Sequence, residues 1–231
     1  MKRIASKVSG GIESYLRKIF GLMTAAVGVT ALTTFIMLHY GAWAVLISHG
    51  GLSITYYIIV FGGFALSIWA QMRAFSMPPA TAKLLLFLYS VLMGIAITPM
   101  ILVSSGISII IALILTMVMF ACMALFGYKT AKDLSFLGTF LFMGMIGLII
   151  VGIVSMIMGP LGVVFNQIVS LVGVLVFALF TAYDMQYLKN AYYAIGDGEQ
   201  KNQLAVLGAL HMYISFVAIF QYLLGFLNSR D

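Results

Sequence analysis

Charged residues are scarce in this 231-residue chain, at 8% of the sequence against roughly 25% in an ordinary soluble domain. Such a low charge excludes a soluble globular protein, because its surface could not be covered. It also excludes intrinsic disorder, which requires high charge and low hydrophobicity. The chain has one cysteine, Cys122, which excludes an internal disulfide and a multi-cysteine metal site. Cys122 lies in an apolar run, where we expect a small core residue.

Apolar runs occupy most of the chain, and 63% of its residues are hydrophobic. A bilayer-spanning helix needs about 20 apolar residues, and these runs are too long and continuous for the strands of a membrane β-barrel. The sequence predicts an all-α membrane protein, a seven-transmembrane-helix bundle. We expect a cytoplasmic basic N-terminal segment at 1–18 and one transmembrane domain at 19–231. The expected spans are 19–40, 53–72, 84–104, 107–128, 136–158, 166–188 and 204–227.

Lysine and arginine residues follow an alternating pattern along the chain. The first, third and fifth connections have none, and one arginine lies at the C-terminus. The others fall in the N-terminal segment and the second, fourth and sixth connections: Lys2, Arg3, Lys7, Arg17, Lys18; Arg73, Lys83; Lys129, Lys132; Lys189, Lys201. The positive-inside rule then predicts a cytoplasmic N-terminus and an external C-terminus. The net charge of +6 is therefore attributed to topology, and no nucleic acid partner is expected. An even number of spans would require a re-entrant segment, for which the seventh run is our candidate.

Small residues recur within the runs, as in Gly21 with Ala25, Gly63 with Ser67, and the glycines of the fifth run. We interpret them as sites of close helix packing, because hydrophobicity alone does not drive helices together in lipid. Pro99 lies inside the third run and is expected to kink its helix.

Asp184 is the only charged residue within the seven runs. A charge inside a membrane costs several kcal/mol unless it is paired or hydrated. Asp184 lies five residues before Lys189, which would place it roughly 7–8 Å from the cytoplasmic end of its helix. Two interpretations remain open: a hydrogen-bonded carboxylate that serves stability alone, or a gate, proton site or cation site.

His211 and Ser215 are four residues apart in the seventh run, so they share a helix face. His211 is either a neutral histidine bonded to a backbone carbonyl or a titratable partner of Asp184. Asp133 precedes the fifth run and is predicted to cap its helix.

No enzyme motif is present: the sequence has no HExxH, no GxSxG and no P-loop. Three scattered histidines and one intramembrane acid do not predict a metal centre. We therefore expect no catalytic activity, no resident metal and no cofactor, although calcium could be a transported ion.

Three stretches resemble the Bax inhibitor-1/YccA-like family, the transmembrane Bax inhibitor motif proteins. They are 126–135 (FGYKTAKDLS), 173–184, which ends in Thr181-Ala182-Tyr183-Asp184, and 207–213 (LGALHMY). The resemblance covers nearly the whole chain in length, order and loop charge, and the short tails are similar to those of a bacterial member. It implies a fold of seven helices with the last helix central.

The family is associated with a pH-controlled cation leak, notably of calcium, and one bacterial member interacts with a membrane-bound ATP-dependent protease. In leak members, two aspartates on the sixth and seventh helices share a hydrogen bond, because two close carboxylates do not both ionise readily. Asp184 matches the first aspartate, whereas Ser215 stands at the position of the second. Where some members have a basic residue on the second helix, this chain has Gln71, with Arg73 two residues later.

Two functions from different classes follow. The first is a pH-sensitive cation leak channel of the bacterial inner membrane, with calcium as one candidate ion. Its gating or cation-binding residues would be Asp184, Ser215 and His211, with Gln71 and Arg73 as partners on the cytoplasmic side. The second is a non-transporting regulatory protein that binds a membrane protease or another membrane partner through the N-terminal segment 1–18.

Overall fold

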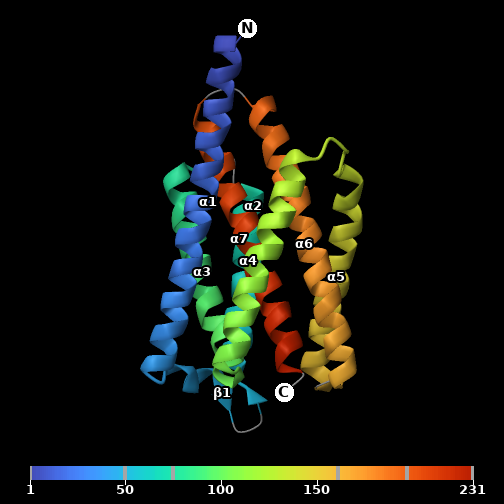
Figure 1. Ribbon diagram of the computed structural model, residues 1–231. Helices are drawn as coiled ribbons and strands as arrows, with labels where there is room; N and C mark the ends of the chain where they lie inside the picture. Colours follow the sequence, from blue (N-terminus) through green and yellow to red (C-terminus); the bar gives the residue numbers. More distant parts are fainter. Residues whose placement is uncertain (1, 49–50, 74–75, 160–161, 196–197, 230–231) are drawn as a thin grey trace. The chain divides into compact units, whose positions relative to one another are not determined.

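The chain folds into seven long helices, and the computed structural model describes residues 2–48, 51–73, 76–159, 162–195 and 198–229, with side chains from residue 11 onward. The helices are α1 (Lys2–His39), α2 (Ile54–Arg73), α3 (Pro79–Val103), α4 (Gly106–Lys129), α5 (Ser135–Met158), α6 (Val163–Ala194) and α7 (Glu199–Asn228). All seven are long and apolar enough to cross a membrane, which confirms the prediction of a seven-span all-α membrane protein (Figure 1).

A short element without α-helix follows α1. It consists of the 3₁₀ helix η1 (Ala42–Leu46) and the antiparallel strands β1 (Ile47–Ser48) and β2 (Gly51–Leu52). Gly41 enters this element in the left-handed conformation, with φ of 68°, which an L side chain rarely adopts. Residues 49 and 50, between the two strands, lie outside the described part of the chain.

The chain divides into two compact units. Unit 1 comprises Met1–Val103 and Leu188–Tyr213, and unit 2 comprises Ser104–Tyr187 and Ile214–Asp231. Helices α6 and α7 therefore each contribute residues to both units. The two units are described separately below.

Unit 1 is built on a close crossing of α1 and α3 at Gly94. A β-carbon at Gly94 would lie 2.8 Å from the Thr30 carbonyl oxygen, so a larger residue would not fit. Hydroxyl groups of α1 bond to backbone carbonyls of α3 here: Thr34 Oγ1 donates to the Gly94 oxygen at 2.9 Å, and Thr30 Oγ1 to the Ser90 oxygen at 3.0 Å. Because these carbonyls gain a second donor within the apolar helix, the crossing is held by hydrogen bonds as well as by packing.

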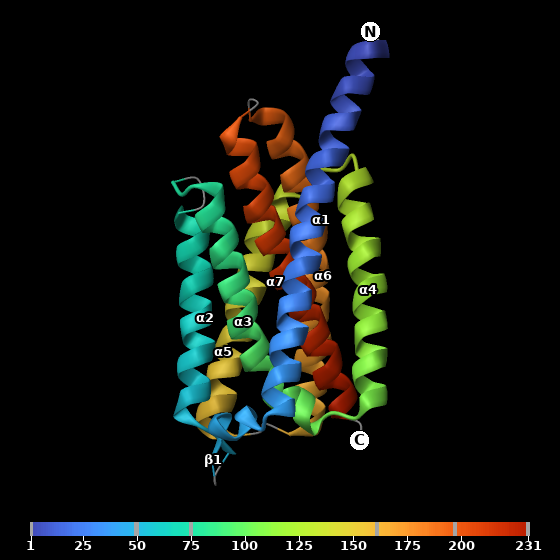
Figure 2. The same cartoon turned by 90° about the vertical axis from the view of Figure 1, so that its left-hand side faces the viewer.

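Helices α2 and α3 run side by side in the same unit (Figure 2). Gly63 of α2 is in ordinary contact with Leu92 and Tyr89 of α3, each of which has an atom 3.8 Å from where a β-carbon on the glycine would lie. Ser67, one turn later, is also buried. The predicted packing role of this small-residue pair is therefore confirmed.

Unit 2 contains α4, α5 and most of α6, with α5 and α6 adjacent (Figure 1). A β-carbon at Gly138 of α5 would lie 3.0 Å from the Tyr183 ring, and one at Gly144 would lie 3.2 Å from Val176. These two glycines of the fifth run do pack against a helix. Gly147 and Gly152 do not, since no atom of the described residues lies within 4 Å of their β-carbon positions, and the same holds for Gly21 of α1.

Several boundaries differ from those expected. Helix α1 begins at Lys2 and not near Ile19, so the described residues of the N-terminal segment 1–18 are helical and continuous with the first span; their cytoplasmic location stays a prediction. Ile12, Tyr15 and Ile19 are buried at helical spacing, which explains the extension. Helix α7 is continuous for 30 residues and long enough to cross, as a seventh span requires.

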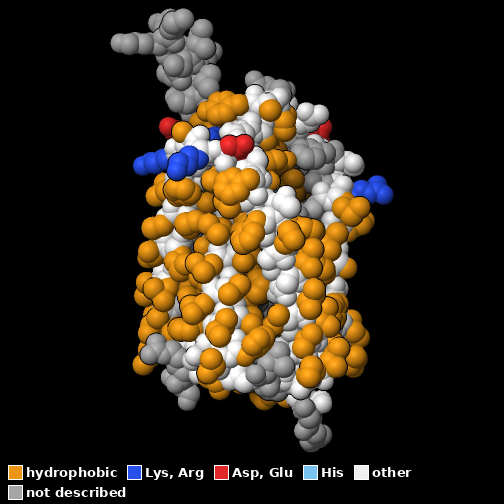
Figure 3. All heavy atoms as spheres, turned by 90° about the vertical axis from the view of Figure 1, so that its right-hand side faces the viewer, with side chains coloured by type: hydrophobic (Ala, Val, Ile, Leu, Met, Phe, Trp, Pro, Cys, Tyr) orange, Lys and Arg blue, Asp and Glu red, His pale blue; other side chains and the backbone are white. Residues whose placement is uncertain are grey.

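Helix α7 is also the most buried span: 78% of its apolar window is buried, against at most 39% for any other helix. This agrees with the expectation of a central last helix. On the face drawn in Figure 3, apolar side chains are spread along most of the length, and charged side chains gather near one end. Cys122 is exposed on α4, so the expectation that it is a core residue was wrong. On a lipid-facing helix, an apolar position is exposed without contacting water.

Candidate functional site

The candidate site lies in unit 2, on the turn of α6 from Thr181 to Gln186. Asp184 is 8% exposed, and Thr181 and Ala182 beside it are fully buried. Thr181 Oγ1 donates to the Phe177 carbonyl oxygen at 2.9 Å, so this hydroxyl is satisfied within its own helix. The structure thus places the charged residue predicted from the sequence in a buried environment inside a candidate span.

Asp184 is farther from the end of its helix than the sequence suggested. Helix α6 does not stop near Lys189 but continues to Ala194. Ten residues at about 1.5 Å each separate Asp184 from that end, which is roughly 15 Å, or twice the expected distance. The error arose because the polar residues after Lys189 ended the apolar run without ending the helix.

The backbones of α4 and α5 approach this turn closely. A β-carbon at Gly127 of α4 would overlap the Ala182 carbonyl oxygen, and one at Gly138 of α5 would touch the Tyr183 ring. Ala182 and Tyr183 are the two residues immediately before Asp184. The turn of α6 just before Asp184 is therefore close-packed against α4 and α5, and backbone as well as side-chain atoms form the contacts.

Ser215 of α7 belongs to the same unit as Asp184 and is 3% exposed. Phe216 beside it packs against Phe120 of α4, with ring centroids 5.5 Å apart and planes at 80°. A serine hydroxyl can donate or accept a hydrogen bond but does not titrate in the physiological range. This region of α7 thus supplies a buried hydroxyl where the family's leak members have a second carboxylate.

His211 and Gln71 form a contact within unit 1. His211 Nε2 lies 3.1 Å from Gln71 Oε1, which joins α7 to α2. The contact requires a proton on Nε2, because an amide oxygen can only accept. His211 is half-buried and Gln71 is exposed, and Arg73, at the end of α2, is exposed as well. The predicted association of His211 and Arg73 with Asp184 stays a prediction.

Gln186 is a buried polar residue that the sequence reasoning did not single out. Its amide bonds to the connection between α4 and α5: Leu134 N–H donates to Gln186 Oε1 at 2.8 Å, and Gln186 Nε2 donates to the Lys132 carbonyl oxygen at 2.7 Å. The signal in the sequence was a polar residue inside the sixth apolar run, two positions after Asp184. In the structure Gln186 is 7% exposed. Because an amide carries no charge, it does not stand out in a search for intramembrane charges.

The connection itself is ordered by Asp133. Its Oδ1 accepts a hydrogen bond from the Ser135 hydroxyl at 2.6 Å and another from the Ser135 N–H at 2.9 Å. The Ser135 hydroxyl and then its N–H lower the pKa of the exposed Asp133 carboxyl. Ser135 is the first residue of α5, so Asp133 caps this helix from one position earlier than the formal cap residue, Leu134.

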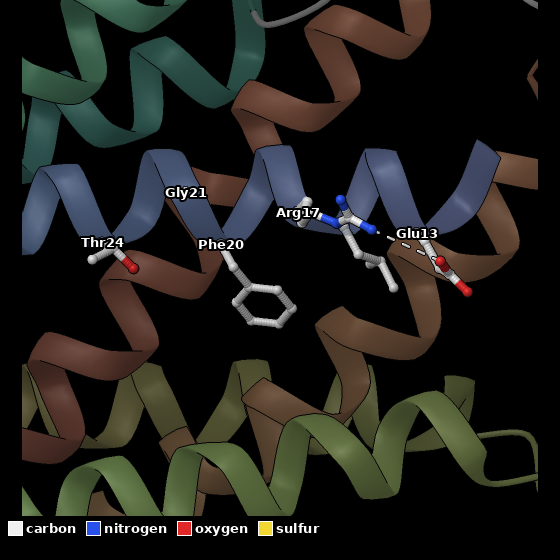
Figure 4. Close-up of a pocket in the computed structure, with 6 residues that line it drawn as sticks. Glu13, Arg17, Phe20, Gly21 and Thr24 are labelled. Carbon is white, nitrogen blue, oxygen red and sulfur yellow. Dashed lines mark ion pairs between the residues drawn. The ribbon is translucent and has the colours of Figure 1, made fainter. Parts of the chain in front are cut away.

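A second feature is an open hollow along one face of α1, in unit 1 (Figure 4). Glu13 and Arg17 form an ion pair across one helical turn there, at 3.9 Å, with side chains 66% and 83% exposed. Exposed pairs of this kind contribute about 0–1 kcal/mol. The hollow contains no predicted site residue. Among the described residues, no three His, Cys, Asp or Glu side chains are grouped so that they could hold a metal ion.

Comparison with known proteins places the chain in a family. Residues 12–231 match the family model described as "Inhibitor of apoptosis-promoting Bax1". The chain is 30% identical to the inner membrane protein YbhL of Escherichia coli, over 95% of this chain and 93% of that protein. It is 30% identical to an uncharacterised protein of Rickettsia prowazekii, over 95% and 91% of the two chains. A protein of Borreliella burgdorferi is 31% identical over 94% and 93%. The chain is a seven-helix membrane protein, and it belongs to the Bax inhibitor family.

Proposed function

We propose that this protein is a pH-sensitive cation leak of a bacterial inner membrane, gated at Asp184. The observation that carries the proposal is the burial of this carboxyl group, 8% exposed, in a membrane-spanning helix. The inner membrane is proposed from the Escherichia coli relative, whose name gives that location.

The packing around Asp184 supports a link between its protonation and the position of the helices. An ionised carboxylate in an apolar interior is costly unless it is paired or hydrated. Gly127 and Gly138 hold the two residues before Asp184 in close contact with α4 and α5, so this turn of α6 is packed directly against both helices. A change of charge at Asp184 would therefore be accommodated by movement of α6 against its neighbours, which is what a gate requires.

Ser215 limits which gating mechanism and which ion can be proposed. Because residue 215 is a serine, Asp184 has no carboxylate at this position with which to share a proton. Calcium prefers six to eight oxygen ligands and is usually bound by several carboxylates. We therefore propose a leak that does not depend on a stable calcium site, and sodium and potassium belong in the same test as calcium.

The decisive experiment is ion flux from the purified protein in liposomes over a pH series. We expect the wild type to conduct cations with a pH-dependent rate, and Asp184→Asn to remove most of that dependence. The matched control is Glu199→Gln, which neutralises an exposed carboxylate in the first turn of α7 and should leave the profile unchanged. Equal flux and an equal pH profile in wild type and Asp184→Asn would end the gate proposal.

The proposed orientation has the N-terminus in the cytoplasm and the C-terminus outside. It is supported by the lysines and arginines of the N-terminal segment and of the second, fourth and sixth connections. A reporter fused after Asp231 should be active only in its extracytoplasmic form. Activity of a cytoplasmic reporter at this position would reverse the orientation.

The alternative function, a non-transporting regulatory protein, is supported by the helical N-terminal segment. Helix α1 continues to Lys2, so the basic N-terminal segment is part of a rigid helix that could present a recognition surface. A membrane protease or another membrane partner would bind there. Deletion of residues 2–10 should then abolish co-purification of the partner with the protein and leave any liposome flux unchanged. Loss of flux without loss of a partner would favour the leak.

A further inference from the structure

Two buried glutamines each bond to the backbone of a connection between helices. Gln186 of α6 bonds to the α4–α5 connection, within unit 2. Gln203 of α7 is 8% exposed, and its Nε2 donates to the Met77 carbonyl oxygen of the α2–α3 connection at 2.8 Å, within unit 1. Each unit thus contains a buried glutamine whose amide bonds to a connection between helices. Of these two glutamines, Gln186 is close to Asp184 in sequence and Gln203 is not.

The Gln186 bonds join segments that are distant in sequence. Leu134 and Lys132 lie 52 and 54 residues before Gln186 along the chain. The amide uses its acceptor for one backbone group and its donor for the other, which satisfies an N–H group at the start of α5. At neutral pH neither glutamate nor lysine could replace it, because glutamate offers no donor and lysine no acceptor.

The turn that carries Asp184 is consequently held at several points. Gly127 of α4 contacts Ala182, Gly138 of α5 contacts Tyr183, and the α4–α5 connection is bound at Gln186. Residues 182 and 186 are four apart and share one face of α6, and residue 183 lies about 100° from residue 182 around a helix with 3.6 residues per turn. The connection therefore extends, by about one helical turn, the side of α6 that α4 and α5 already hold.

We propose that Gln186 is a positioning residue: by binding the α4–α5 connection, it fixes the turn of α6 on which Asp184 lies. The inference rests on the proposed function for its effect on ion flux. Its structural part, that loss of the Gln186 bonds loosens the Asp184 turn as well as the connection, can be measured without any conduction.

The substitution Gln186→Glu gives a switchable test. The carboxylate keeps an acceptor for Leu134 N–H but loses the donor to the Lys132 carbonyl, and protonation restores that donor. Gln186→Met keeps a similar length and removes both bonds at every pH. The ionisable groups on the connection and on α6 near this position, which will influence where the new carboxyl titrates, are Lys129, Lys132, Asp133, Asp184 and Lys189.

Hydrogen–deuterium exchange of the full-length protein, followed by mass spectrometry, is the first readout. At neutral pH we expect Gln186→Glu to raise exchange about tenfold in peptides covering 130–136 and also 178–186, as for a buried group left unsatisfied. Corrected for intrinsic rates, the increase should fall at acid pH. Gln186→Met should show it at all pH values. The matched control Gln203→Glu should raise exchange near 76–80 and leave 178–186 unchanged.

An increase confined to 130–136 would overturn the proposal, because Gln186 would then anchor the connection without positioning Asp184. Ion flux is the second readout: in a conducting wild type, Gln186→Glu should shift the pH midpoint and Gln203→Glu should not. An unshifted midpoint with loosened 178–186 would also overturn the positioning role. If the wild type conducts no cations, the proposed leak fails, while the exchange result at 178–186 still decides the role of Gln186.

Discussion

Gly127 of α4 lies directly against the backbone of Ala182 of α6, so that a β-carbon on the glycine would overlap the Ala182 carbonyl oxygen. Because backbone cannot rotate away as a flexible side chain can, this contact sets how closely the two helices approach. Ala182 is fully buried and precedes Asp184 by two residues. The spacing of α4 and α6 is thus determined next to the candidate gate.

Gly127→Ala should destabilise the protein by about 1–3 kcal/mol, the usual range for overpacking in a close-packed core. The matched control is Gly147→Ala in α5, where no described atom lies within 4 Å of the β-carbon position. There the added methyl should be neutral or stabilising by up to ~1 kcal/mol, since alanine favours a helix more than glycine does. Unfolding in mixed detergent micelles measures both, and equal effects at the two positions would contradict the contact.

Tyr213→Phe should cost about 0.5–1.5 kcal/mol of stability. The Tyr213 hydroxyl is fully buried and lies 2.6 Å from Thr30 Oγ1, while the Thr30 hydroxyl also contacts the Ser90 carbonyl at 3.0 Å. Thr30→Val completes a double-mutant cycle, in which we expect a coupling near the ~0.6 kcal/mol average for hydrogen bonds between membrane helices. Additive effects of the two substitutions would show that the hydroxyl pair contributes nothing to stability.

Asp133 should make stability fall at low pH through its bonds to Ser135. These bonds lower the pKa of the folded carboxyl, so its contribution is fully present above the unfolded pKa of about 3.9. The contribution is lost as the pH falls through the lower folded value. In an NMR titration, Ser135→Ala should bring the Asp133 pKa part of the way back, because the backbone N–H bond remains. An unchanged titration would mean that the hydroxyl has no effect.

His211→Gln and Ser215→Asp should separate two routes to pH dependence. If His211 senses pH through its contact with Gln71, His211→Gln shifts the pH midpoint of flux and Ser215→Asp adds a second titration. If pH dependence in this family instead requires a pair of carboxylates, Ser215→Asp supplies the second carboxylate. That variant alone then creates or shifts the pH midpoint of flux. The two variants are compared in the same liposome assay, with wild type on each day. An unmoved midpoint in His211→Gln would exclude the histidine as a sensor.

The sequence predicted the number, type and approximate limits of the helices, because long apolar runs are a strong and local signal. It failed where helices extend beyond their apolar part. The helix of α1 continues to Lys2 through charged and small residues, and Ile12 and Tyr15 bury one face at a spacing that a hydropathy average does not detect. Likewise, α6 continues past Lys189 to Ala194.

The candidate site was predicted from titratable residues inside apolar runs and from the family resemblance. Asp184 and His211 were found because such residues are conspicuous in an apolar run, and Ser215 and Gln71 came from their family positions. Gln186 was missed because its partners lie more than 50 residues away and an amide is neutral. Cys122 was assigned to the core because an apolar run does not reveal which helix face meets lipid and which meets protein.

The burial of α7 has a consequence for biosynthesis. The helix that is translated last is also the one with the largest buried share, 78% of its apolar window. Earlier helices must therefore wait in the bilayer with inward-facing groups uncovered, such as the Thr30 hydroxyl that later meets Tyr213. A ribosome stalled before residue 199 would leave a chain that is already inserted but still lacks its centre.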